Sequence, residues 1–148
     1  MSGPDLSAEA CVFCRILAGE EPVSAFYEDD ICLGLMTIGP VNAGHAMVIP
    51  RRHAPYLADL PAEEWGHVAR IGQRTAAAIR TSGLQCTGVN LFVADGESAE
   101  QEVFHLHLHI VPRFEGDGFG FRYDERHFRQ PPRAELDRVA TLLRDRIG

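Results

Sequence analysis

The chain of 148 residues contains no lysine, because all fourteen of its basic residues are arginine. This absence excludes a Schiff-base lysine, a lysine general base and a phosphate loop that depends on lysine. The chain also lacks any apolar run close to the roughly 20 residues that a transmembrane helix requires. Its first residues have no basic start and no apolar core, unlike a secretory signal. We therefore expect a cytoplasmic protein with no membrane association.

Positive charge is also scarce, since the net charge is −7. An acidic chain is poorly suited to bind the backbone of a nucleic acid polymer, so we expect no such partner. Cysteine is limited to four residues, which in a cytoplasmic protein indicates thiols or metal ligands rather than a disulfide framework. No repeat or linker divides the sequence, so residues 1–148 are expected to form a single domain.

Alternating and helical patterns predict the secondary structure. Expected strands cover residues 23–28, 31–36, 45–49, 88–93 and 103–111, the first two forming a hairpin around Asp29 and Asp30. A long helix is predicted between Pro61 and Gly83, and a closing helix after Pro132. Because regular helices do not separate the strands, we predict an α+β fold with a mainly antiparallel five-stranded sheet, one long central helix and a C-terminal helix.

Three histidines, His105, His107 and His109, alternate with aliphatic residues in the last predicted strand. Successive side chains of a strand point to opposite faces, so the three imidazoles share one face at spacings of about 6.6 Å. They are close enough to act together on one phosphate-sized group or one metal ion. The pattern leaves both chemistries open, including a zinc hydrolase that uses the triad itself as ligands.

A second motif is Cys11-Val-Phe-Cys14, whose spacing lets two thiolates bind one tetrahedral ion. A zinc site needs two further ligands, and histidines must supply them because there is no second cysteine pair. The residues alone leave the choice open among His45, His53, His67 and the triad. A redox pair is disfavoured, because the motif precedes every predicted strand.

Over nearly its whole length the chain resembles the histidine triad (HIT) family, in its zinc-binding bacterial-type branch. The resemblance lies in four segments, in order along the chain: residues 11–20 with the cysteine pair, residues 40–53 from Pro40 to His53, residues 95–104 with Gln101, and the triad segment 105–113. It implies a HIT-like α+β fold whose sheets join across a homodimer. It also implies a nucleotide-binding enzyme that splits phosphoanhydrides, phosphoramidates or phosphosulfates.

The resemblance assigns roles to individual residues. His107 matches the family's nucleophile, and His109 the residue that contacts the phosphate or the leaving group. Expected substrate contacts are Gln101 at the phosphate, Thr37 and Ile38 at the nucleoside, and His45 inside the site. A structural zinc ion is expected on Cys11, Cys14, His53 and His105.

The leading hypothesis is a nucleotide hydrolase or transferase that cleaves the α-phosphate bond of adenylyl-type substrates, with a purine mononucleotide moiety. Phosphoramidates and dinucleoside polyphosphates are the candidate substrates, and a covalent His107-nucleotidyl intermediate is expected. The alternative is a nucleotide-binding or partner-binding module with little catalytic activity. It is motivated by Thr37, Ala94 and Glu100, which depart from the usual family residues.

Overall fold

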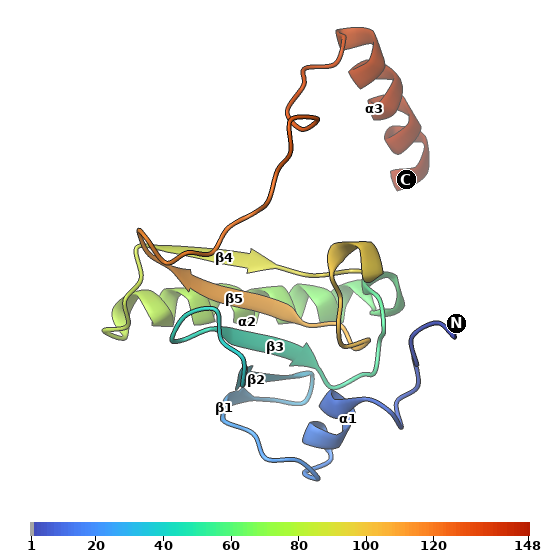
Figure 1. The fold of residues 1–148 in the computed structure, drawn as a ribbon. Helices are drawn as coiled ribbons and strands as arrows, with labels where there is room; N and C mark the ends of the chain where they lie inside the picture. Colours follow the sequence, from blue (N-terminus) through green and yellow to red (C-terminus); the bar gives the residue numbers. More distant parts are fainter. Residues whose placement is uncertain (1) are drawn as a thin grey trace. The chain divides into compact units, whose positions relative to one another are not determined.

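The computed structural model describes residues 2–148, shown as a ribbon in Figure 1. The helices and strands, in chain order, are α1 (Val12–Leu17), β1 (Ala25–Glu28), β2 (Cys32–Met36), β3 (Ala46–Pro50), α2 (Ala62–Thr81), β4 (Gly88–Phe92), β5 (Leu108–Arg113) and α3 (Arg133–Ile147). In this part of the chain, five strands pair antiparallel in the order β1-β2-β3-β5-β4. The predicted α+β class with its five-stranded antiparallel sheet is confirmed.

The two faces of the sheet carry different layers. Helix α2 packs on one face, where Val68 and Ile71 meet Val48, Leu108 and Ile110 of the central strands. The opposite face carries α1, which lies in front of the sheet in Figure 1, and a second apolar cluster: Cys11, Phe13, Leu33, Leu35, Met47 and Ile49. Because Leu108 and Ile110 of β5 pack toward α2, His109 between them lies on the α1 side. The His105 and His107 rings contact Phe13 of α1 and so lie on the same side.

The predicted hairpin forms around Asp29. Its carboxylate accepts hydrogen bonds from the backbone N–H groups of Ile31 and Cys32, both at 2.8 Å. The Tyr27 hydroxyl and Nε2 of His67 also reach it, at 2.7 and 2.6 Å. Burial raises the pKa of Asp29, but these hydrogen bonds outweigh it and hold the pKa well below its usual range. The ionised carboxylate therefore ties the β1–β2 turn to α2, which carries His67.

Helix α2 approaches the central strand closely because it has a glycine at the contact. A Cβ atom on Gly72 would lie only 2.4 Å from a methyl carbon of Leu108. The helix ends where expected, since Gly83 follows it with a φ of +86°, a conformation that glycine adopts at little cost. The close packing fixes β5, and with it the histidine segment, against the long helix.

Two expectations about the elements were wrong in detail. The strand predicted over 103–111 begins only at Leu108, because the N–H of Leu106 donates to Ala54 of a loop, at 2.7 Å, instead of joining the sheet. The helix α1, which holds the cysteine pair, was not predicted. It has only six residues, too short for a helical repeat to be recognised.

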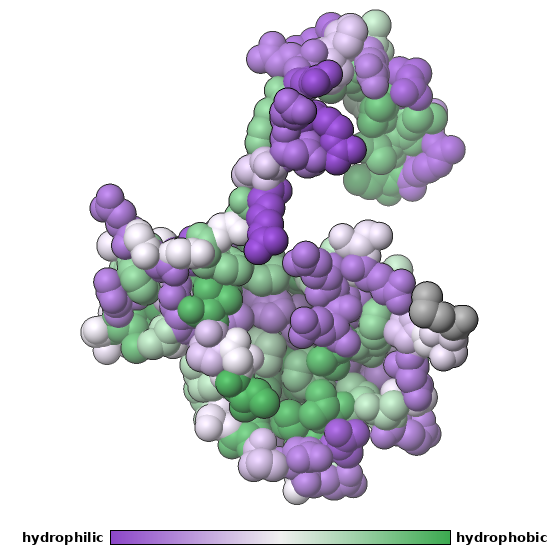
Figure 2. All heavy atoms as spheres, in the orientation of Figure 1, coloured by the Kyte–Doolittle hydropathy of each residue, from purple (hydrophilic) through white to green (hydrophobic). Residues whose placement is uncertain are grey.

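The chain divides into two compact units, one reaching to Asp117 and the other comprising Gly118–Gly148. The single-domain prediction for residues 1–148 stays a prediction. Every residue of the second unit is exposed, and Figure 2 shows apolar side chains on α3 among hydrophilic ones. None of the helices described, over residues 2–148, combines the length and the apolar character needed to cross a membrane.

Candidate active site and metal centre

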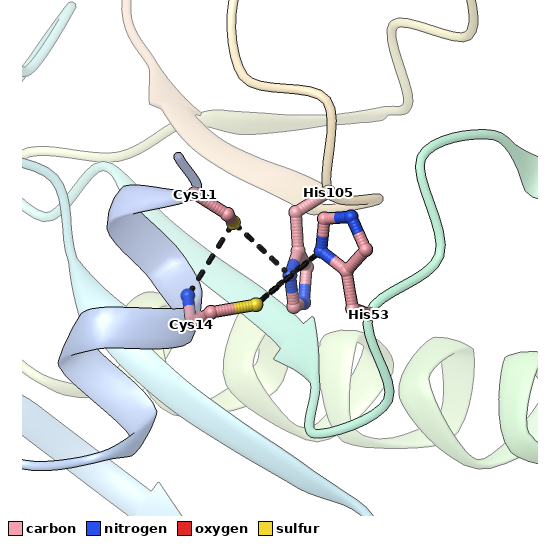
Figure 3. Close-up of side chains that lie close together, drawn as sticks. All are labelled: Cys11, Cys14, His53 and His105. Carbon is pink, nitrogen blue, oxygen red and sulfur yellow. Dashed lines mark hydrogen bonds between the residues drawn. The ribbon is translucent and has the colours of Figure 1, made fainter. Parts of the chain in front are cut away.

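Four sulfur- and nitrogen-bearing side chains point toward one another beside α1 (Figure 3). The sulfur atoms of Cys11 and Cys14 lie 3.5 and 3.6 Å from Nδ1 of His105. The Cys14 sulfur lies 3.3 Å from Nδ1 of His53, and the two Nδ1 atoms are 3.3 Å apart. The structure thus brings together the four residues that the family resemblance implied as zinc ligands, and His45 lies outside this cluster.

These separations fit a tetrahedral zinc site. Zinc binds thiolates at about 2.3 Å and imidazoles at about 2.0–2.1 Å, which places tetrahedral ligands roughly 3.3–3.8 Å apart. The other ring nitrogens are already used, because Nε2 of His105 donates to the Pro50 carbonyl at 2.7 Å and Nε2 of His53 to the Leu6 carbonyl at 2.8 Å. With Nε2 of each ring directed to a carbonyl, the Nδ1 atoms of His53 and His105 are the ones that face the two sulfurs, an arrangement that a cation stabilises.

The electrostatics of the cluster agree with this geometry. Burial, and then the neighbouring Cys11 thiol, raise the pKa of Cys14 to about 11, so a thiolate there needs a compensating positive charge. Burial lowers the pKa of His105 to about 4, which keeps its ring neutral at pH 7 and able to act as a ligand. The donor set of two sulfurs and two imidazoles suits zinc.

His107 is the central imidazole of the triad and is 6% exposed. Its Nδ1–H donates to the carbonyl of His105 at 2.8 Å, so in the neutral ring the lone pair is on Nε2. Burial lowers the pKa of His107, although that hydrogen bond and the charge of Glu102 act in the opposite direction. Nε2 of His107 has no hydrogen-bond partner. Among the described residues every fully buried side-chain nitrogen has one, so Nε2 keeps some exposure to solvent.

His109 and His45 lie beside His107. Nδ1 of His109 is 2.9 Å from Nε2 of His45, and the His107 and His109 rings are 4.7 Å apart between centroids. Burial, and then the neighbouring imidazoles, lower the pKa of His109 to about 3, and burial also lowers the pKa of His45. Both rings are therefore neutral at pH 7.

Gln101 is buried and ties together three backbone segments. Its side-chain oxygen accepts a hydrogen bond from the Gly96 N–H at 2.8 Å, and its amide nitrogen donates to the carbonyls of Pro55 and Val103 at 2.7 and 3.1 Å. These bonds fix the loop that enters the triad segment. The side chain expected at the phosphate thus has backbone partners in this structure.

The predicted nucleoside contacts follow β2. The backbone N–H of Thr37 donates to the carbonyl of His45 at 3.4 Å, which places Thr37 beside the histidine row. Its hydroxyl accepts a hydrogen bond from the Gly39 N–H at 3.3 Å. Ile38 is fully exposed, so its apolar side chain is free to contact a planar base.

Two aromatic rings support the histidines and were not identified from the sequence. Phe92 of β4 stacks on His109 with centroids 4.5 Å apart and an interplanar angle of 17°. Phe13 of α1 meets the His107 ring edge-on, with centroids 5.2 Å apart. Phe92 was within reach of sequence reasoning, because it lies in a predicted strand. Nothing in the pattern around Phe13 indicated its contact with a residue 94 positions away.

The triad does not converge on a single ion. In the described part of the chain, neither His107 nor His109 belongs to a group of three or more side chains placed to hold a metal. His105 and His107 also present different nitrogens for binding. In His105 it is Nδ1, which faces the cysteines, and in His107 it is Nε2. The geometry therefore does not favour a zinc hydrolase with the triad as its ligands.

Known proteins resemble this chain in both sequence and fold. The chain is 42% identical to a zinc-bound histidine triad family protein from Mycobacterium smegmatis, with a TM-score of 0.73 over 94% of this chain and 99% of that one. A HIT family protein from Bacillus anthracis is 34% identical and superposes with a TM-score of 0.87 over 96% of this chain and all of that one.

A plant relative carries an enzymatic name. The adenylylsulfatase HINT3 of Arabidopsis thaliana is 37% identical over 108 residues, which cover 72% of this chain and 54% of the plant protein. The HIT domain family matches residues 18–116, a span that includes His53, Gln101 and the whole triad. Together with the antiparallel sheet and the histidine row, these matches show that the chain belongs to the HIT family.

Proposed function

We propose that the protein is a nucleotide hydrolase or transferase that cleaves the α-phosphate bond of adenylyl-type substrates through a covalent His107-nucleotidyl intermediate. Nucleoside phosphoramidates and dinucleoside polyphosphates are the proposed substrates. The observation that carries the proposal is the hydrogen bond from Nδ1 of His107 to the His105 carbonyl, which leaves Nε2 unprotonated and open. Membership of the HIT family and similarity to an adenylylsulfatase support nucleotide hydrolysis in general.

In the first step, the lone pair of Nε2 of His107 attacks the α-phosphorus and a P–N bond forms. The bond from phosphorus to the leaving group breaks and its electron pair departs with that group, which, when it is an amine, takes up a proton from solvent as it leaves. The imidazole then carries a positive charge, which the His105 carbonyl stabilises by accepting the Nδ1–H bond at 2.8 Å. One difficult displacement is thereby divided into two easier ones.

In the second step, water attacks phosphorus, the P–N bond breaks and its electrons return to Nε2 of His107. The proton of the water passes to solvent, and a nucleoside monophosphate leaves. His109 contributes a hydrogen bond to the phosphoryl or leaving-group oxygen, where negative charge develops. A neutral His109 that gave up its proton would become an imidazolate, so its role is to donate a hydrogen bond.

Recognition of the nucleoside is assigned to residues around the end of β2. We propose that Ile38 packs against a purine base and that the Thr37 hydroxyl meets the ribose. A single hydroxyl is a weaker partner for ribose than the Asp or Asn usual at this position in the family, so ribose contacts are expected to contribute modestly. Gln101 acts at the phosphate by holding the backbone of its loop in place.

Cys11, Cys14, His53 and His105 are proposed to hold a structural zinc ion, in keeping with the zinc-bound relative from Mycobacterium smegmatis. Zinc supplies strong bonds to thiolates and imidazoles without redox chemistry, and so adds folding free energy. His105 immediately precedes Leu106 and His107, so a fixed His105 also fixes the carbonyl that orients the nucleophile.

We further propose a cytoplasmic homodimer whose sheets join edge to edge. β1 and β4 are at the two ends of the strand order, so each has one edge with no partner strand among the described residues. Sedimentation equilibrium tests the proposal: a dimer is expected, and a monomer at every accessible concentration would contradict it.

The intermediate is tested by intact-mass measurement after brief exposure to an adenosine phosphoramidate. The parent protein is expected to gain one adenylyl group, and His107→Asn none. A matched control is His127→Asn, since His127 lies in the exposed second unit. Absence of the adduct from the parent, with unchanged turnover in His107→Asn, would refute the proposal and favour a nucleotide-binding module instead.

A further inference from the structure

His45 immediately precedes β3 and is 5% exposed, although it lies beside the proposed reacting groups. The backbone N–H of Val41 donates to its Nδ1 at 3.1 Å. An N–H group can only donate, so Nδ1 of His45 must be unprotonated. The turn that presents this N–H is closed by a second hydrogen bond, from the His45 N–H to the Asn42 carbonyl at 3.0 Å.

The position of one proton follows from this contact. A neutral imidazole with unprotonated Nδ1 carries its proton on Nε2, and Nε2 of His45 lies 2.9 Å from Nδ1 of His109. His45 therefore donates, and Nδ1 of His109 accepts. A neutral His109 must then carry its own proton on Nε2, its second ring nitrogen.

The ring of His109 is also held in place. It stacks on Phe92 with an interplanar angle of 17°, and its backbone pairs with Met47 of β3 and Phe92 of β4. Phe92 limits tilting of the ring, but a stacked phenyl ring does not distinguish one nitrogen from the other. The hydrogen bond from His45 is the contact that makes this distinction.

We propose that His45 is a positioning residue that uses the Val41 N–H as a reference and fixes His109 in the tautomer with its proton on Nε2. The inference rests on the proposed function, in which His109 donates a hydrogen bond to developing negative charge. In the other tautomer, the same ring position would present a lone pair to an anionic oxygen and repel it. His45 itself has protein partners on both nitrogens, so it has no free ring nitrogen for the substrate.

The chain allows a matched pair of substitutions at this position. In His45→Asn, the side-chain oxygen can replace Nδ1 as the acceptor for Val41, but the amide is too short to reach His109. In His45→Gln, the longer amide can reach His109 and donate to its Nδ1. The two variants thus differ in whether the side chain can donate to Nδ1 of His109. Thermal unfolding of both variants monitors the fold.

The first readout is the tautomer of His109, measured by long-range proton–nitrogen correlation spectra of histidine-labelled protein. The parent and His45→Gln are expected to carry the proton on Nε2, whereas His45→Asn is expected to show a mixture or the opposite tautomer. An unchanged tautomer in His45→Asn would overturn the proposal. The readout requires no turnover, so it remains decisive even if the proposed function fails.

The second readout separates positioning from substrate binding. Loss of a group that orients a metal-bound imidazole reduces activity by about 10- to 100-fold, and we expect a similar range for an imidazole that contacts the substrate. For His45→Asn we expect that loss in kcat with KM changed less than threefold, and a substantial recovery of kcat in His45→Gln. A raised KM with unchanged kcat, or equal losses of kcat in both variants, would overturn the proposal. Failure of the proposed function would show differently, as the absence of an adduct on His107 in the parent.

Discussion

His105 and His107 are two residues apart on one segment, yet they present opposite ring nitrogens to their surroundings. In His105, Nε2 donates to the Pro50 carbonyl and Nδ1 faces the cysteine pair. In His107, Nδ1 donates to the His105 carbonyl and Nε2 is open. Two side chains of the same type thus become a metal-ligand candidate and a nucleophile candidate. The reason is that a backbone carbonyl accepts a hydrogen bond from Nε2 in His105 but from Nδ1 in His107.

The histidines outside the triad show the same division. His53 resembles His105, because Nε2 donates to a carbonyl, that of Leu6, and Nδ1 faces the cluster. His45 differs, because an N–H rather than a carbonyl reaches its Nδ1. A carbonyl fixes a proton on the nitrogen it meets, whereas an N–H excludes one. One backbone group therefore determines which nitrogen of each ring is available. Substitutions can test the metal-ligand candidates, His53 and His105, separately from the active-site candidates, His45 and His107.

The largest expected effect is loss of the nucleophile. His107→Asn should lower kcat by about 10⁴- to 10⁶-fold, the range measured when single members of a catalytic triad are removed. Metal content should stay the same, because His107 lies outside the cluster of four. Steady-state kinetics and elemental analysis of the same preparation check both statements. A variant that lost its metal together with its activity would contradict the separation of the metal cluster from the active-site histidines.

Breaking the metal cluster should act chiefly on stability. Cys14→Ser, or removal of zinc by a chelator, is expected to lower the free energy of unfolding by several kcal/mol, since structural zinc contributes roughly 10–16 kcal/mol of binding free energy in zinc-finger peptides. For a chain of this size, each kcal/mol lost lowers Tm by roughly 2–4 °C. Differential scanning calorimetry of parent and variant measures the change. Cys86→Ser is the matched control, because Cys86 lies outside the cluster, and a loss equal to that of Cys14→Ser would count against the metal site.

Acid should weaken the fold through the buried imidazoles. Burial lowers the pKa of His109 to about 3 from its ordinary 6.5, so below pH 6.5 the unfolded chain binds a proton that the folded chain does not. Stability present at pH 7 is therefore lost as pH falls from about 6.5 toward 3, by at most about 1.4 kcal/mol per pH unit for one group.

Urea unfolding between pH 6.5 and 4 tests this expectation. His109→Asn should flatten the dependence of the unfolding free energy on pH by up to one proton. The depressed pKa of Asp29 also costs stability as the pH falls below about 5, but this loss is common to parent and variant and cancels in their difference. An identical slope in parent and variant would show that His109 titrates normally in the folded protein.

The smallest expected effect concerns the aromatic rings that contact His107 and His109. Phe92→Leu keeps an apolar side chain but removes the ring stacked 4.5 Å from His109. Stacked rings contribute about 0.5–1.5 kcal/mol beyond their buried area, so kcat should fall about three- to tenfold. Phe13→Leu, which removes the edge contact with His107, offers a comparison on the neighbouring ring. Unchanged kcat in both variants would mean that backbone pairing alone positions the imidazoles.

Much of the sheet could be predicted from local pattern. The hairpin at Asp29, the helix between Pro61 and Gly83 and the strand at 88–93 each have a turn residue or a clear period. The region before Leu108 could not be placed, because its partner is the Ala54 carbonyl of a distant loop. The six-residue helix α1 was not predicted for a related reason. The contacts of Cys11 and Phe13 with the histidine segment join residues far apart in the sequence.

The sequence alone determined which side chains carry chemistry and that three imidazoles share a face, because both follow from residue type and from the two-residue period of an extended chain. Tertiary structure decided which nitrogen of each ring is free. The deciding groups, the carbonyls of Leu6, Pro50 and His105 and the N–H of Val41, are backbone atoms present in any sequence. Only the folded arrangement determines which of these atoms meets which ring, and hence where each proton lies.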